Sequence, residues 1–494
     1  MPVPHTGDPR WRPSGRWAAA TIVTVVILVR AAVFVLWERA HFDSDQAITG
    51  LMAKHLAEGR AFPVFWYGQS YMLAVESWLA APLFLVFGSS VTALKVPLLA
   101  GNVAIGLLLL RGFIHELGLR PLTAVVPTLF FALPAAGTSA RLVEANGGNV
   151  EPFLYVLLIW TLRARPWLCG LVFGIGFLHR EFTLYGFLAL LAVEAVRGEL
   201  FTVAGARRRA LTIASAAGVW LLVQWGKQFS SGAGPGTSLA DVYRPQDNIS
   251  ALAGRICIDP HTLMSGFQKL ATDHWTVLFG TLPQPLRDFG IASTVSQGAA
   301  WSALVLIAIL LIAVTGIVRA RAVAGSEFGI FLVITAVFSI CGYVVGRCGA
   351  IDFYFMRYEL LSIVGVAGLA GWFLQVERSR ARRGAWMAIV ALWFVIVAVP
   401  HVKLYDEYLR KPPEDVRRTL IALLDARGVR YGASHYWIAY AITFLADERI
   451  ILKSEDLVRI REYQRLVDDH AGDIWRVARE PCGEQIMPRL YLCR

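Results

Sequence analysis

The sequence predicts an all-α, polytopic membrane protein with a small α/β domain at its C-terminal end. Three observations support this fold class. Of the 494 residues, 56% are hydrophobic and 17% are charged, and the apolar residues gather in long blocks. A soluble protein would carry about 25% charged residues. Because a helix needs about 20 largely apolar residues to cross a bilayer, the blocks predict membrane helices.

The apolar blocks supply about eleven candidate membrane helices. They cover residues 17–37, 91–110, 121–137, 149–162, 167–180, 182–196, 210–229, 299–318, 328–346, 356–376 and 385–400. Some are short and are joined by tight turns, so we expect their ends to shift. The first block is too long for a cleavable signal peptide, and no small-residue cleavage site follows it.

Basic residues in the short loops predict which side of the membrane each loop faces. We place the N-terminus, with Arg10, Arg12 and Arg16, in the cytoplasm, as the positive-inside rule suggests. The net charge of +11 then reflects topology and attraction to anionic lipid. We expect no nucleic-acid binding, because the basic residues are scattered over many short loops. The C-terminal domain falls outside.

The predicted topology divides the chain into a membrane domain, residues 1–400, and an extracytoplasmic α/β domain, residues 401–494. Two long external loops belong to the membrane domain, at 38–90 and 230–298. In the first loop we expect two helices at the membrane surface. Residues 46–58 have apolar side chains on one side, and the apolar run 72–87 is interrupted by a glutamate and a proline.

The C-terminal domain shows short helix and strand signals. "PPEDVRRTLIALLDARGV" has proline before an amphipathic stretch and glycine after it, which predicts a helix. "RYGAS" and "RIILKS" predict strands on either side of a helix at 435–447, "DLVRIREYQRLVDDH" a further helix, and "MPRLYLCR" a last strand. Cys482 and Cys493 lie outside and could form a disulfide.

Two carboxylates stand where the chain leaves the first predicted membrane helix, in "HFDSDQAITGLMAKHLAEG". Asp43 and Asp45 could simply cap the following helix, since aspartate is favoured there. Alternatively, one of them could act as a general base at the bilayer surface. Together with His41 and His55 they could also bind a divalent ion. No ligand spacing supports that, so we expect no metal and no other cofactor.

The order of motifs resembles that of the GT-C superfamily of membrane glycosyltransferases. The most similar branch is the GT39-like one, which contains protein O-mannosyltransferases, the aminoarabinose transferase of lipid A and RgtA-D-like bacterial proteins. That branch has an acidic pair at the start of the first external loop. "DQAITGLMA" fits this pattern with Asp45 in the first acidic position. Gln46 replaces the second acid, and Asp43 could supply the missing carboxylate.

Three later segments extend the resemblance. "ALKVPLLAGNVAIG" places Lys95 where the family has a basic residue at a helix start. "ARLVEANGGNVEP" offers Glu144 and Glu151 in the place of a second acidic site. "MRYELLSIVGVAGLAG" matches an Arg-Tyr pair before a late helix, with Arg357 and Tyr358. The motifs and topology together span about four fifths of the chain.

The resemblance implies a bacterial inner-membrane enzyme that uses a polyprenyl-phosphate sugar, since nucleotide sugars are not found outside the cytoplasmic membrane. It implies an inverting transfer to a hydroxyl of a glycan, lipid or protein acceptor, with Asp45 as base. The departing phosphate needs cations. The candidates on the external side are Lys95, Arg141, Arg180, Arg347 and Arg357. We expect Arg357 to be the most important, and Lys95 the next.

Other side chains are candidates for substrate contact, and each has a purely structural alternative. In "FLHREFTLYG", Arg180 could line the substrate site or pair with a neighbouring acid. Tyr358, Glu144 and, in the first loop, Glu76 and Gln69 complete the predicted substrate-binding set. In the C-terminal domain, the aromatic stretch "ASHYWIAYAITF" could bind a sugar, although a packed helix explains it as well.

Two other functions are open at this point. A transporter or flippase for lipid-linked sugars would also have buried charges within its helices, but we find no inverted repeat of the kind common in transporters. A non-catalytic envelope assembly protein would explain the glutamine in the second acidic position. The elaborate first external loop favours the glycosyltransferase.

Overall fold

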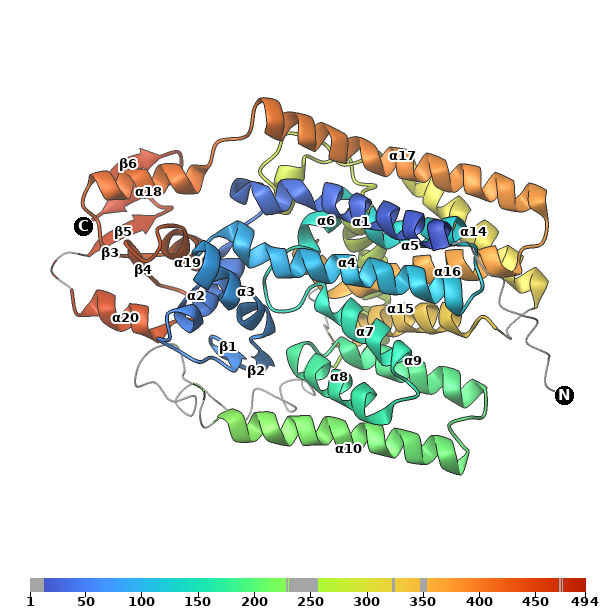
Figure 1. The fold of residues 1–494 in the computed structure, drawn as a ribbon. Helices are drawn as coiled ribbons and strands as arrows, with labels where there is room; N and C mark the ends of the chain where they lie inside the picture. Colours follow the sequence, from blue (N-terminus) through green and yellow to red (C-terminus); the bar gives the residue numbers. More distant parts are fainter. Residues whose placement is uncertain are drawn as a thin grey trace.

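The computed structural model describes residues 13–227, 230, 256–321, 325–346, 353–470, 472 and 474–494. It consists of a long helical bundle with a small sheet-containing domain at one end (Figure 1). The predicted fold class is therefore confirmed. Residues 231–255 of the expected second external loop, and Arg347, lie outside the described part of the chain.

A helix forms at each of the predicted membrane segments. These are α1 (Pro13–Leu36), α4 (Val91–His115), α5 (Pro121–Ala132), α7 (Glu151–Thr161), α8 (Pro166–His179), α9 (Thr183–Val196), α10 (Val203–Gly226), α14 (Ser302–Ala320), α15 (Glu327–Gly346), η7 (Phe353–Ser362) with α16 (Ile363–Val376), and α17 (Arg380–Arg410). Within the described residues, α1, α4, α14, α15, η7 with α16, and α17 are long and apolar enough to cross a membrane. The helices α5, α7, α8 and α9 are apolar but shorter.

The segment predicted as the first external loop folds into elements at the end of the bundle nearest the C-terminal domain (Figure 1). They are η1 (Glu38–Ala40), α2 (Ser44–Ala57), the hairpin strands β1 (Phe65–Trp66) and β2 (Gln69–Leu73), and α3 (Val75–Phe87). The two predicted surface helices are thus present as α2 and α3. Because α2 is buried along most of its length, it is a core element and not only a helix lying on the membrane.

Two further groups of short helices lie between the membrane segments. The helix α6 (Ala136–Arg141) follows α5. The described part of the second external loop contains α12 (Pro260–Lys269), η5 (Leu270–His274), α13 (Trp275–Leu278) and η6 (Leu286–Phe289). The hydroxyl of Thr138 in α6 donates to the carbonyl oxygen of Leu278 at 2.8 Å. The second external loop is therefore fastened to the segment that precedes α7.

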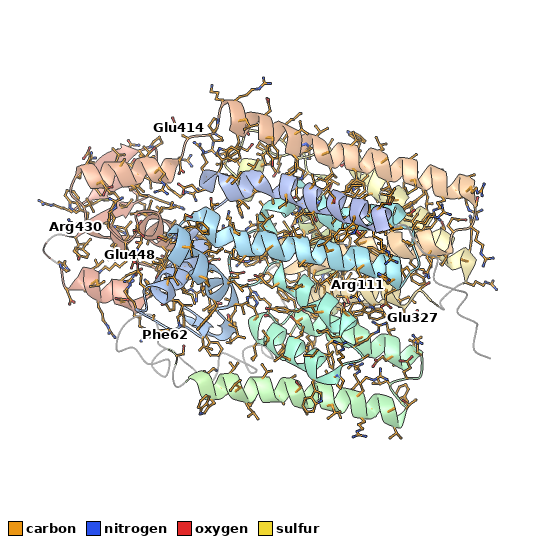
Figure 2. The ribbon with its side chains drawn as sticks, viewed as in Figure 1. Phe62, Arg111, Glu327, Glu414, Arg430 and Glu448 are labelled. Carbon is orange, nitrogen blue, oxygen red and sulfur yellow. A yellow bond between two sulfur atoms is a disulfide. The ribbon has the colours of Figure 1, made fainter. Side chains whose placement is uncertain are left out.

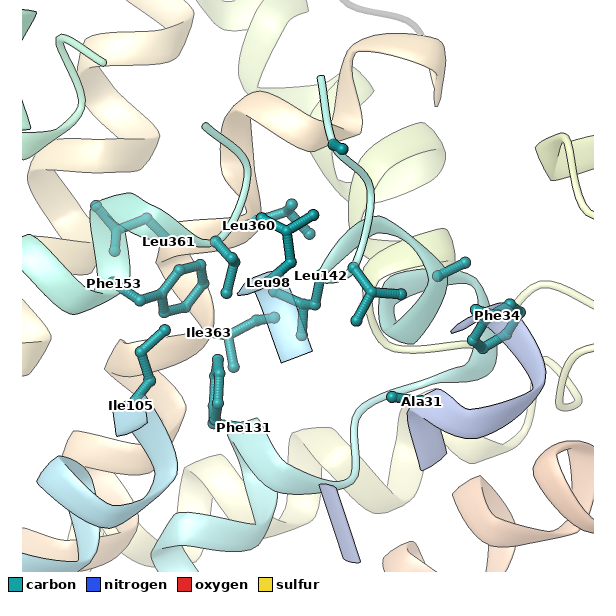
Figure 3. Close-up of a cluster of buried hydrophobic side chains, with 14 of the residues drawn as sticks. Ala31, Phe34, Leu98, Ile105, Phe131, Leu142, Phe153, Leu360, Leu361 and Ile363 are labelled. Carbon is teal, nitrogen blue, oxygen red and sulfur yellow. The ribbon is translucent and has the colours of Figure 1, made fainter. Parts of the chain in front are cut away.

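The hydrophobic core connects segments that are far apart in the sequence. Apolar side chains from α1, α4, α5, α7 and the junction of η7 with α16 meet in one cluster (Figure 3). Among them are Phe34, Leu98, Phe131, Phe153 and Leu361. Burial of these side chains from water or lipid contact fixes the relative positions of the helices. In particular, it holds η7 against the helices that follow the first external loop.

The C-terminal domain is a five-stranded mixed sheet with helices packed on it. Its elements are α18 (Val416–Ala426), β3 (Tyr431–Ser434), α19 (Tyr436–Leu445), β4 (Ile451–Ser454), α20 (Arg461–Asp468), β5 (Trp475–Ala478), β6 (Glu484–Met487) and β7 (Leu490–Cys493). The strand order is β4-β3-β5-β7-β6. The strand β3 is parallel to its neighbours β4 and β5, and β7 is antiparallel to β5 and β6.

The predicted elements of this domain are mostly present, with two additions. The strands β5 and β6 were not predicted from the sequence, and the expected helix over 456–470 is shorter, beginning at Arg461. Cys482 and Cys493 form a disulfide, the pairing that the sequence allowed. The helix α17 continues to Arg410, past the expected domain boundary at 401, so the sheet-containing part follows this helix directly.

The C-terminal domain docks on α2 through polar and apolar contacts. The ammonium group of Lys54 lies 2.6 Å from Asp447 and 3.0 Å from Glu448, and both acids follow α19. Gly50 faces Phe444, and a Cβ atom added to Gly50 would lie 2.5 Å from the ring. Glu448 is visible at this end of the molecule and Glu327 at the other (Figure 2). The helix α19 therefore lies along α2, with its own first turn beside the first turn of α2.

Candidate functional site

The site forms around the first turn of α2, where three distant parts of the chain meet. Asp45 comes from α2, Arg357 from η7 and Tyr436 from the first turn of α19. A guanidinium nitrogen of Arg357, Nη1, donates to Oδ2 of Asp45 at 3.2 Å, and the hydroxyl of Tyr436 donates to Oδ1. The structure therefore brings together the two residues that the sequence analysis ranked first.

The Asp45–Arg357 pair is partly open. The side chain of Asp45 is 14% exposed and that of Arg357 is 20% exposed. Among the described residues, Nε of Arg357 has no hydrogen-bond partner. A guanidinium group has five N–H donors, so Arg357 can hold Asp45 and still offer hydrogen bonds to an anionic ligand. This combination of a reachable carboxylate and an unsaturated cation suits acid–base chemistry beside a phosphate.

Asp43 has a different role from Asp45 in the structure. It is the N-cap of α2, and its Oδ1 accepts a hydrogen bond from the backbone N–H of Gln46 at 3.0 Å. Burial, with repulsion by Glu144 and Asp45, raises the pKa of Asp43 to about 7. The capping function that aspartate fulfils at helix starts is thus fully met at this position.

The raised pKa of Asp43 predicts a pH-dependent stability. Between about pH 4 and pH 7 the folded protein keeps a proton that the unfolded chain has lost, so stability falls as the pH rises through this window. Asparagine caps helices equally well and carries no charge. We expect Asp43→Asn to raise the thermal unfolding midpoint in detergent at pH 8 and to leave it unchanged near pH 4. An identical shift at both pH values would contradict this explanation.

A second acid, Glu144, lies in a polar layer next to the site. Its side chain is fully buried, with Oε1 accepting from Nη1 of Arg141 at 2.7 Å and Oε2 from Nδ2 of Asn149 at 2.9 Å. Although burial opposes ionisation, the charge of Arg141 and the nearby His41 hold the pKa of Glu144 well below its usual value. Glu144 is therefore an ionised, structurally engaged carboxylate, and Arg141 is its partner.

Lys95 is fully buried, and its ammonium group donates hydrogen bonds to backbone carbonyl groups. It donates to the carbonyl oxygen of Phe34 at 3.0 Å and to that of His41. These bonds fasten the end of α1, and the residues leading to α2, onto α4. The structure thus gives Lys95 a structural role as an anchor between helices. A contact between Lys95 and a donor phosphate stays a prediction.

Arg180 lies close to Arg357 through shared aromatic neighbours. Its guanidinium carbon is 5.8 Å from the ring centre of Phe182 and 5.9 Å from that of Tyr358. The guanidinium carbon of Arg357 is 5.3 Å from the same Tyr358 ring. Two predicted cations therefore converge on Tyr358 from η7 and from the α8–α9 turn. Together they place two guanidinium groups around one aromatic ring of the site.

The two remaining predicted residues belong to the first external loop. Glu76, in the first turn of α3, accepts hydrogen bonds at 2.7 Å from the backbone N–H groups of Gly147 and Gly148. It thereby holds the turn that carries Asn149. Gln69 lies in β2, in register with Trp66 of β1, and its side chain is half-buried. Glu76 therefore supports the turn whose Asn149 side chain donates a hydrogen bond to Glu144.

Sequence reasoning understated one residue of the site, Tyr436. The aromatic stretch around it was equally consistent with a packed helix, and α19 is indeed largely buried. Its contact with Asp45 joins residues 391 positions apart. Burial and the negative charge of Asp45 raise the pKa of Tyr436 above its usual value, so the hydroxyl stays protonated and acts as a donor. Nothing in the local sequence indicated this contact.

Comparisons with known proteins give similarity in overall arrangement only. No family model and no curated protein matches the chain. Among solved structures, the Archaeoglobus fulgidus oligosaccharyltransferase in the apo form has a TM-score of 0.49 and 13% identity, covering 95% of this chain and 70% of that one.

Two other solved structures align with most of this chain at lower TM-scores. ArnT from Cupriavidus metallidurans, bound to undecaprenyl phosphate, has a TM-score of 0.43 and 12% identity, covering 95% of this chain and 93% of that one. The arabinosyltransferase EmbB from Mycobacterium smegmatis has a TM-score of 0.42 and 13% identity, covering 91% and 42%.

Proposed function

We propose that the protein is a membrane glycosyltransferase of the GT-C type. It transfers a sugar from a polyprenyl-phosphate donor to an acceptor hydroxyl, on the extracytoplasmic face of a bacterial inner membrane, with inversion at the anomeric carbon. The observation that carries the proposal is the contact between Asp45 and Arg357. These residues are 312 positions apart, they meet at 3.2 Å, and both are partly accessible.

In the proposed step, Asp45 acts as the general base. Its carboxylate removes the proton from the acceptor hydroxyl as the oxygen attacks the anomeric carbon of the donor. The new bond joins that oxygen to the sugar, and the bond between the anomeric carbon and the phosphate oxygen breaks. The electron pair leaves with the polyprenyl phosphate. A single displacement of this kind inverts the anomeric configuration.

The leaving phosphate gains negative charge as its bond to the sugar breaks, and guanidinium groups suit that charge. Arg357 has an N–H group without a partner among the described residues, and the guanidinium group of Arg180 approaches the same Tyr358 ring. When a donor phosphate binds, Arg357 can contact it while remaining close to Asp45. Base and leaving group are then held on opposite ends of one guanidinium group.

The fold supports the proposed membrane orientation. The helix α2, the external hairpin β1–β2 and the C-terminal domain all lie at one end of the bundle (Figure 1). Positive-inside counting assigns this end to the extracytoplasmic side. A donor carried on a lipid reaches that surface without leaving the bilayer, and an acceptor glycan, lipid or protein reaches it from outside.

The experiment that tests the function is glycan analysis in a strain that lacks the gene. Envelope lipids, polysaccharides and proteins from the deletion strain, and from the strain complemented with the wild-type gene, are compared by mass spectrometry. We expect one class of molecule to lose a sugar residue in the deletion strain and to regain it on complementation, with the lipid-linked donor accumulating meanwhile. Accumulation of donor on the cytoplasmic side alone would favour a flippase.

The hydroxyl of Tyr436 offers a narrower test of the site. Tyr436→Phe removes one hydrogen bond that holds the carboxylate of Asp45 in place. We expect kcat/KM to fall by about tenfold, or about 1.4 kcal/mol. Tyr440→Phe is the control, because the Tyr440 hydroxyl accepts from the backbone of Arg459 and Ile460 in the same domain. Equal kcat/KM values for both variants would contradict the assignment.

A further inference from the structure

Three buried ionisable side chains converge beside the site without taking part in the proposed transfer. Glu76 comes from the first turn of α3, Glu151 is the first residue of α7, and His179 is the last residue of α8. Each offers one potential ligand atom, and these atoms all lie within 4.8 Å of one another. Their residues are 3%, 7% and 1% exposed. Two carboxylates and one imidazole are thus gathered in the protein interior.

Three polar atoms of this cluster lack hydrogen-bond partners among the described residues. Among the described residues, neither carboxylate oxygen of Glu151 has a hydrogen bond, and Nε2 of His179 has none either. Leaving a buried polar group unsatisfied costs about 1–3 kcal/mol, and more for a charged one. These unsatisfied polar atoms are close together, because the atoms of Glu151 and His179 lie near Glu76. A ligand that satisfies all of them at once would remove the cost.

The surroundings hold the potential ligand atoms in place. Nδ1 of His179 is 3.0 Å from the hydroxyl of Tyr155, which leaves Nε2 for the cluster. Histidines that bind metals almost always bond a second group through the other ring nitrogen. Each oxygen of Glu76 accepts one backbone N–H, from Gly147 or Gly148, so its orientation is fixed while a lone pair on each oxygen stays available.

Gly148 makes this close approach possible. Its φ is +98°, a conformation that other residues rarely adopt, and an added Cβ atom would lie 3.3 Å from Nε2 of His179 and would collide with Arg180. The guanidinium of Arg180 is itself directed to the rings of Phe182 and Tyr358. The "NGGN" turn therefore lets the backbone approach the cluster.

We propose that Glu76, Glu151 and His179 bind one divalent transition-metal ion, such as Zn²⁺, through one oxygen of each carboxylate and Nε2 of the imidazole. Imidazole with carboxylate is a donor set that suits such ions, whereas calcium and magnesium prefer oxygen alone. This site differs from the histidines and aspartates around residues 41–55 that the sequence analysis considered for a metal. It does not depend on the proposed glycosyl transfer.

The ion would join three segments that shape the site. It would tie α3 of the first external loop to the start of α7 and the end of α8. The "NGGN" turn that bonds Glu76 also carries Asn149, which donates a hydrogen bond to Glu144. The alternative occupant of the cluster is a proton shared between the two carboxyl groups, and the experiment below separates the two.

The test is metal analysis of the purified full-length protein in detergent. The protein is stripped with a chelator, reloaded with Zn²⁺ and desalted, and the metal is counted by mass spectrometry. We expect about one tightly bound ion per chain in the wild type and in Asp45→Asn, which keeps the cluster intact. Glu151→Gln and His179→Gln should each bind Zn²⁺ at least tenfold more weakly, and added Zn²⁺ should raise the unfolding midpoint of the wild type and of Asp45→Asn but not of these two variants.

A spectroscopic measurement on the wild type makes the proposal independent of how the variants fold. X-ray absorption at the zinc edge should show nitrogen and oxygen ligands that include a single imidazole. Absence of stoichiometric zinc in the wild type, or zinc that is retained in both Glu151→Gln and His179→Gln, would overturn the proposal. The first of these results would instead support a shared proton.

Discussion

Replacing Asp45 by asparagine is expected to lower the rate of glycosyl transfer by about 10²–10⁴-fold, the contribution typical of a general base. Asparagine has the same shape, and its carbonyl oxygen can still accept from Tyr436 or Arg357. We therefore expect the variant to fold and to bind polyprenyl phosphate nearly as well as the wild type. The measurement is transfer by the purified enzyme in detergent or liposomes, with donor binding measured in parallel.

The matched control is Asp43→Asn, two residues away on the same helix start. Asp43 caps α2 through the backbone of Gln46, a bond that asparagine can also make. We expect this control to retain most of the transfer activity. If Asp45→Asn were as active as Asp43→Asn, Asp45 would not be the base, and the proposed mechanism would fall.

Replacing Arg357 by lysine is expected to lower kcat by about 10²–10³-fold and to weaken donor binding as well. Lysine keeps the positive charge but loses the planar fork of donors that can span a carboxylate and a phosphate. The interaction grows as the phosphate gains charge in the transition state, so its loss affects kcat as well as KM. Steady-state kinetics with varied donor concentration separates the two contributions.

A control for Arg357 exists at the opposite end of the bundle. Arg382 also pairs with a carboxylate, that of Glu377, at 2.9 Å. Arg382→Lys changes a guanidinium–carboxylate pair without touching the site, and we expect unchanged kinetics. Should Arg357→Lys lower activity only in proportion to protein stability, Arg357 would be a structural residue and its phosphate contact would be excluded.

The helices of the membrane domain could be predicted because their cause is local. An apolar run of sufficient length has few ways to satisfy its backbone in a bilayer except as a helix. The helical cap at Asp43 is local too, and capping was one of the two predicted alternatives. The strands β5 and β6 were missed because they are short and carry charged residues, as in "WRVA" and "EQIM". Their pairing with β3 and β7 comes from contacts that no short segment encodes.

The site was predictable only in part, for a related physical reason. Asp45 and Arg357 could be named because each stands in a recognisable motif at a helix start. The role of Lys95 could not, since it depends on the carbonyl groups of Phe34 and His41 that the packing of α1 against α4 brings to its ammonium group. The contact of Tyr436 with Asp45 depends on the docking of an entire domain. Side-chain chemistry can be anticipated from sequence, whereas its partners follow from tertiary packing.

The contact of Asp45 with Tyr436 has a consequence for how the protein is made. The ribosome incorporates Asp45 long before it incorporates Tyr436, because 391 positions separate the two residues. During that interval the early helices can insert and pack, but the carboxylate has neither its hydroxyl donor nor the domain above it. Chains that end before the C-terminal domain are therefore expected to be inactive. The site is complete only after this domain has been synthesised and has docked on α2.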